Sequence, residues 1–116
     1  MAWDEGLAQL LRDDLAGHPV TEKRMFGGLA FLLGGHMVCG VHRGGVMFRL
    51  GKENYAEVLA LPGTSTLQMG DRPMVGMIGA DEGLMADDAR RGHLMALALG
   101  VVTALPPKLA KPAKTR

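Results

Sequence analysis

The first fifteen residues carry apolar side chains at the spacing of one face of an α-helix. These positions are Trp3, Leu7, Leu10, Leu11 and Leu15. Such spacing predicts an amphipathic helix with one buried stripe. Acidic residues favour the start of a helix and glycine favours its end, so we expect this helix to begin near Asp4 and to end before Gly17.

From residue 20 onward, apolar positions alternate with polar ones, and glycines separate the short segments. A period of two is typical of strands, and glycine pairs suit the tight turns between antiparallel strands. We therefore expect four strands, at residues 20–25, 29–33, 36–42 and 46–50.

The second half of the chain predicts two helices and two more strands. The expected elements are a helix over 52–61, strands over 64–69 and 74–79, and a last helix over 87–105. Pro62 and Pro106 end the two helices, since proline does not continue a helix. The main apolar stripe of the last helix consists of Leu94, Leu97, Val101 and Leu105, and it is widened by Ala98 and Val102.

The order helix, four strands, helix, two strands, helix predicts an α+β domain, with an antiparallel sheet and helices mainly on one face. If Met37, Cys39 and Val41 turn toward the helices, the alternate residues lie on a face that no helix covers. The predicted interaction face consists of Leu32, His36, Val38, His42, Met47 and Arg49. Such an apolar patch would expose roughly several hundred Å², a size typical of association sites. We expect a homodimer or a protein partner.

Composition indicates the cellular compartment and the distribution of charge along the chain. The 116 residues contain one cysteine, Cys39, so no internal disulfide can form, and the acidic N-terminus does not resemble a signal peptide. We expect a cytoplasmic protein that does not enter a membrane. The net charge of +1 includes four cations in residues 108–116, which leave nine cations against 12 acids, or −3, in residues 1–107. We expect a single domain over 1–107 and a flexible basic tail over 108–116.

The sequence has no residue pattern typical of a catalytic or metal-binding site. His36 and His42, placed on the same strand face, would lie about 20 Å apart, too far to share one zinc ion. Cys39 is expected to point inward, and Ser65 lacks the glycine-flanked turn of hydrolase nucleophiles. No phosphate-loop glycine motif occurs. We expect no enzyme activity, no cofactor and no metal.

One corner of the chain has two interpretations. Lys23, Arg24, Phe26, Gly27 and Gly28 form either a strand end with a tight turn, which we favour, or a corner that binds an anion or a partner. The second interpretation makes the protein a binder of small anionic ligands or an enzyme of unknown type. A further alternative is an accessory transcription factor that contacts DNA through Lys23, Arg24, Arg49 and the tail. The acidic balance of residues 1–107 supports nucleic-acid binding only weakly.

Several short motifs, in this order, resemble one protein family. They are Arg24-Met25-Phe26-Gly27-Gly28, the hairpin Phe31-Leu32-Leu33-Gly34-Gly35-His36-Met37, Gly70-Asp71-Arg72-Pro73-Met74-Val75-Gly76, and Leu105-Pro106-Pro107-Lys108. Together they are similar to the TfoX/Sxy N-terminal-domain family, from about Thr21 to Lys108. The resemblance implies a fold like that of the type III secretion chaperones and provides no catalytic residues.

Full-length members of that family resemble regulators of natural competence that act with a cyclic-AMP receptor protein and carry a second, C-terminal domain. The resemblance therefore implies a stand-alone N-terminal domain with a role in transcriptional regulation. Many relatives carry a tryptophan in the last helix, where this chain has Gly92-His93.

Overall fold

The computed structural model describes residues 3–25, 27–69 and 71–106. Within these residues the elements follow in the order α1 (Glu5–Asp14), β1 (Val20–Met25), β2 (Gly28–Leu33), β3 (His36–His42), β4 (Gly45–Arg49), α2 (Gly51–Leu59), β5 (Thr64–Met69), β6 (Arg72–Ala80), α3 (Glu82–Ala86) and α4 (Asp88–Thr103). This confirms the α+β class. The predicted tail, 108–116, and Phe26 lie outside the described residues.

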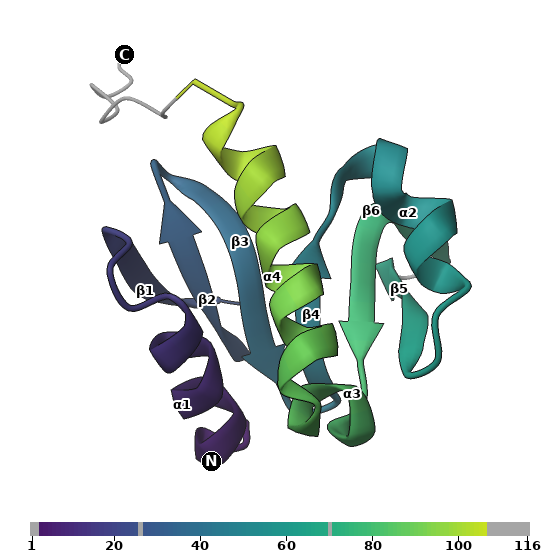
Figure 1. Ribbon diagram of the computed structural model, residues 1–116, viewed down its shortest axis with the longest axis horizontal. Helices are drawn as coiled ribbons and strands as arrows, with labels where there is room; N and C mark the ends of the chain where they lie inside the picture. Colours follow the sequence, from purple (N-terminus) through teal and green to yellow (C-terminus); the bar gives the residue numbers. More distant parts are fainter. Residues whose placement is uncertain (1–2, 26, 70, 107–116) are drawn as a thin grey trace.

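The six strands form one antiparallel sheet in the order β1-β2-β3-β4-β6-β5 (Figure 1). Strands β1 to β4 follow one another as a meander because short glycine turns connect them. After β4 the chain passes through α2 to the far edge, where β5 begins, and β6 returns between β5 and β4. The sheet edges are therefore β1 and β5.

The helices cover one face of the sheet (Figure 1). Helix α4 packs along β3 and β4, α1 packs against β3, and α2 packs against β6 and contacts α4. Beneath them the register aligns one fully buried residue from each of four adjacent strands, namely Phe31, Cys39, Phe48 and Ile78. This row is the centre of a single apolar core.

Helix α1 begins where the sequence predicts. The Asp4 carboxylate accepts hydrogen bonds from the backbone N–H groups of Gly6 and Leu7, at 2.7 and 3.2 Å, and so caps the helix. Ala8 and Leu11 are fully buried in the core. The cap and the buried stripe together explain why this segment is helical.

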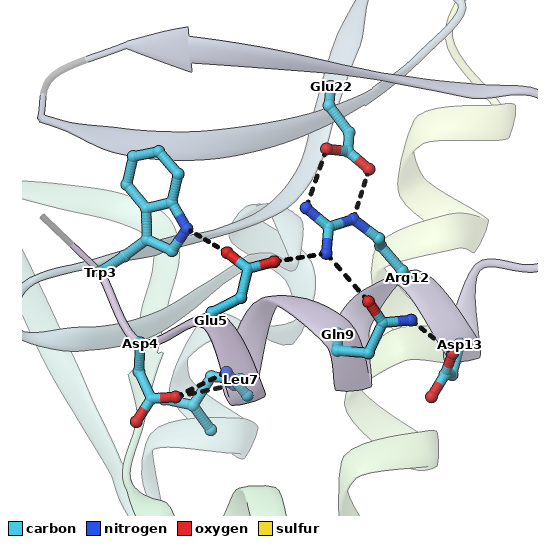
Figure 2. A network of polar contacts seen from close by, with 9 residues as sticks. Trp3, Asp4, Glu5, Leu7, Gln9, Arg12, Asp13 and Glu22 are labelled. Atoms are coloured by element: carbon cyan, nitrogen blue, oxygen red, sulfur yellow. Dashed lines mark hydrogen bonds and ion pairs between the residues drawn. The ribbon is translucent and has the colours of Figure 1, made fainter. Parts of the chain in front are cut away.

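A network of polar contacts attaches α1 to β1 (Figure 2). The Arg12 guanidinium donates to both carboxylate oxygens of Glu22, at 2.7 and 3.1 Å, and to Glu5 at 2.7 Å. Hydrogen bonds from Arg12 and then from the Trp3 ring hold the pKa of Glu5 below its usual value. Arg24 of β1 lies over the same Trp3 ring, 5.6 Å from its centroid, and completes the connection.

The C-terminal region differs from the prediction in two respects. A separate short helix, α3, precedes α4 and begins at Asp81, whose carboxylate accepts from the Leu84 N–H at 2.9 Å. The buried face of α4 is also rotated from the expected stripe, because it consists of Arg91, Leu94, Met95, Ala98 and Val102. Leu97, Val101 and Leu105 are only half-buried. Among the helices of the described ranges, none has both the length and the hydropathy needed to cross a bilayer.

A candidate interaction face

One face of the sheet has no helix packed on it in the part of the chain that the structure describes. Because side chains alternate along a strand, the neighbours of the core row project to this side. The register aligns Ala30, Gly40, Met47 and Gly79 across it. We define the open face as Lys23, Ala30, Leu32, Met37, Gly40, Met47, Arg49, Ser65, Leu67, Met77 and Gly79.

Small residues surround Met47 in the middle of the open face. A Cβ atom added to Gly40 would lie 3.3 Å from the Met47 terminal methyl carbon, so the Met47 side chain extends over that glycine. On the other side, a Cβ added to Gly79 would meet the Ser65 Oγ at 2.8 Å and the Leu67 Cδ2 at 3.3 Å. These neighbours occupy the space above the two glycines. An apolar surface of this kind suits an extended or helical segment laid across it.

The charge of the open face has one sign. Glu22 is the only acidic residue in the described strands, and it lies on the helix side, where it pairs with Arg12. Lys23 and Arg49 are the open face's charged residues, and neither forms an ion pair with another described residue. The surface therefore combines an apolar centre with two cations.

The prediction from the sequence that Val38 belongs to the interaction face is wrong. The register between β2 and β3 shifts, because Phe31 pairs with Cys39 but Leu32 pairs with Met37. The extra residue, Val38, turns into the core beside Cys39 and is fully buried. Met37 takes its place next to Leu32 on the open face and is half-buried.

The same bulge separates the two strand histidines. His36 lies on the helix side, where its Nε2–H donates to the backbone carbonyl oxygen of Pro106 at 2.8 Å. His42 turns to the open side at the end of β3, and its Nδ1 accepts from the Gly44 N–H at 3.0 Å. The expectation that both lie on one strand face is therefore wrong. Of the six residues predicted for the interaction face, Leu32, His42, Met47 and Arg49 lie on the open side.

The candidate corner at the β1–β2 turn does not bring its cations together. Lys23 lies opposite Ala30 on the open face, whereas Arg24 lies opposite the core residue Leu29 and over Trp3. Gly28 is buried, and a Cβ atom there would clash with the backbone carbonyl oxygen of Val41. The glycine therefore permits the close approach of β2 to β3, which favours the tight-turn interpretation.

Two other groups that could carry chemistry have structural roles in this fold. The Cys39 side chain is fully buried, and burial raises the pKa of its thiol far above the usual value. A polar pocket of about 330 Å³ lies near the starts of α1 and α3 and the β3–β4 turn. Two of its acidic residues, Asp4 and Asp81, already cap those helices.

The glycines of the open face and Met37 were not predicted from the sequence. Glycine inside a strand usually indicates a bulge or a close approach, and Gly40 and Gly79 carried that signal. Met77 is 8% exposed yet lies outside the helix-covered core cluster. The bulge that turns Met37 to the open face cannot be recognised from the alternation of apolar and polar residues along the chain.

Comparison with known protein families gives a match. The family described as TfoX N-terminal domain matches residues 10–101, which include all six strands and most of α4. No curated protein and no solved structure matches the chain. Since the matched segment covers well over half of the 116 residues, this chain belongs to the TfoX N-terminal domain family.

Proposed function

We propose that this domain is a non-catalytic docking module that acts in transcriptional regulation by binding a protein segment on its open face. Membership of the TfoX N-terminal domain family supports a regulatory, competence-related domain at the level of the family. The observation that carries the proposal is the apolar centre around Met47, which lies beside two cations on a face whose described strands contribute no acidic residue.

The charge of this face selects the kind of partner. An amphipathic segment with acidic and apolar side chains complements Lys23 and Arg49 as well as the methionines. A second copy docked face to face would instead bring four cations into one interface, where like charges are unfavourable. The occupant that we propose is therefore an acidic amphipathic segment of another protein.

The positions of the cations favour a protein over DNA. Lys23 lies on β1 and Arg49 on β4, and three strand spacings separate these strands by about 14 Å. Arg24 belongs to the opposite face. Phosphate recognition requires cations gathered along one stripe, and the described strands do not gather them.

A peptide titration followed by methionine methyl NMR tests this proposal. The probes are short peptides of leucine and glutamate, with leucine–glutamine and leucine–lysine peptides of equal length as controls. We expect the glutamate peptide to shift the methyl signals of Met37 and Met47 on the open face. Met85 and Met95, buried in the core on the helix side, serve as internal controls and should stay in place.

Charge reversal identifies the face. The double variant Lys23→Glu with Arg49→Glu should no longer bind the glutamate peptide, whereas Lys52→Glu on the exposed side of α2 should still bind it. The proposal fails if the reversed variant binds as before, or if the shifts map to the helices. Tighter binding of duplex DNA, weakening steeply with salt, would favour the nucleic-acid alternative instead.

A further inference from the structure

The two edges of the sheet differ in their protection against further strands. Edge strand β1 carries Glu22, Lys23 and Arg24 in succession, and charged residues on an edge discourage the addition of another strand. Edge strand β5 has the sequence TSTLQM, without a charge or a proline. In the described part of the chain no strand pairs with its outer side. The β5 edge is thus the unprotected one.

Exposed apolar side chains gather near this same edge. Leu61 and Val75 are the large hydrophobic residues that the described residues leave exposed, at 36% and 52%. Leu61 precedes β5, and its carbonyl oxygen accepts from the Thr64 hydroxyl at 2.9 Å. Val75 belongs to β6, the only partner of β5, between the residues paired with Thr66 and Gln68. Leu61 is therefore close to the start of β5, and Val75 lies beside its second half, near Leu67.

We propose that β5 pairs antiparallel with β5 of a second copy of this chain. An antiparallel pair brings the start of one strand beside the end of the other. Leu61 of each copy then lies on the side of the twofold axis where the other copy exposes Val75. Such reciprocal placement of apolar residues is what a twofold dimer interface requires, and this self-complementarity selects a second copy over an unrelated strand.

The bulge beside β5 lies in its neighbour β6 and leaves β5 itself unbroken. The register between the two strands shifts after Thr66 because four residues of β6, 74–77, lie opposite Leu67, so β5 offers a continuous edge from Thr64 to Met69. Thr66 lies near the middle of this edge, and we place the twofold axis there, so that Thr66 lies opposite its own copy. The side chains there are hydroxyls, which do not repel one another across the pair.

The dimer would lengthen the sheet without covering the open face. Antiparallel neighbours in one sheet are related by a twofold axis perpendicular to it, so the helices of both copies stay on the same side. The two open faces become continuous. The proposal is therefore independent of peptide docking, and either can fail while the other holds.

Sedimentation velocity over a wide concentration range tests the edge dimer. We expect the wild-type protein to dimerise reversibly and Thr66→Lys to weaken its dimerisation about tenfold or more, because two lysines then face each other at the axis. The matched control is Thr21→Lys, the same change at an exposed position of the opposite edge strand. It should leave the dimer intact. Circular dichroism checks that both variants fold.

A second variant leaves the strand itself unchanged. Leu61→Ser combined with Val75→Ser removes the exposed apolar contacts and should also weaken dimerisation, while amide exchange in β5 becomes independent of concentration. A wild-type protein that stays monomeric at every concentration would overturn the proposal. So would a Thr66→Lys protein that dimerises as tightly as the wild type, or equal weakening by Thr21→Lys.

Discussion

At the scale of single residues, Arg91 shows how this small core accommodates a charge. It is the buried charged residue of the described chain, at 7% exposure. Its guanidinium donates to both Asp14 carboxylate oxygens, at 2.7 and 3.2 Å, and to the Met85 carbonyl oxygen at 2.7 Å. Asp14 ends α1, where a negative charge opposes the helix dipole. Arg91 compensates that charge and joins α1 to α4.

Removing this arginine should cost much stability. Arg91→Met leaves Asp14 and the Met85 carbonyl without their donor, so we expect the free energy of unfolding to fall by about 3 kcal/mol in urea titrations. The control is Arg90→Met, whose pair with Asp87 is more exposed and should contribute less than about 1 kcal/mol. Adding Asp14→Leu to Arg91→Met should recover part of the loss. Equal losses at positions 90 and 91 would contradict this account.

At the scale of elements, periodicity predicted most of the fold. The ranges 20–25, 36–42 and 64–69 coincide with β1, β3 and β5, because alternation and glycine turns are local signals. Helix α3 was missed because its five residues are too few for a helical period to be recognised. The bulge at Val38 was missed because it depends on pairing between strands. One inserted residue there exchanged Val38 and Met37 between the two faces and separated His36 from His42.

Alanine substitutions at two glycines should change the stability of the protein in opposite directions. Gly28→Ala places a methyl group against the Val41 carbonyl oxygen between paired strands, so the strands must separate, and we expect about 2 kcal/mol of destabilisation. Gly92→Ala lies on the exposed side of α4 with no atom within 4 Å of the added carbon. Alanine is the better helix former there, so this variant should gain about 0.8 kcal/mol. Thermal and urea unfolding measure both changes, and destabilisation by Gly92→Ala would contradict the assigned environment.

At the scale of the whole molecule, the fold is a sheet with helices on a single side, so one core stabilises the entire domain. Cys39 lies in the middle of that core, paired with Phe31 on one neighbouring strand and Phe48 on the other. Local opening of a loop or helix end does not expose it. An opening that separates α4 or α1 from the sheet is needed to give a reagent access to the thiol.

Alkylation of Cys39 should therefore report global unfolding. Because burial raises the pKa of the thiol far above its usual value, the native protein holds it protonated and unreactive, and reaction proceeds through the unfolded chain. Toward alkaline pH the labelling rate should rise until the pKa of an ordinary thiol, about 8.5, and then level off. Arg91→Met should accelerate labelling by the factor that its loss of unfolding free energy gives, about a hundredfold for 3 kcal/mol. Rapid labelling of the stable wild-type protein, or a rate indifferent to Arg91→Met, would show that Cys39 is reached without opening the core.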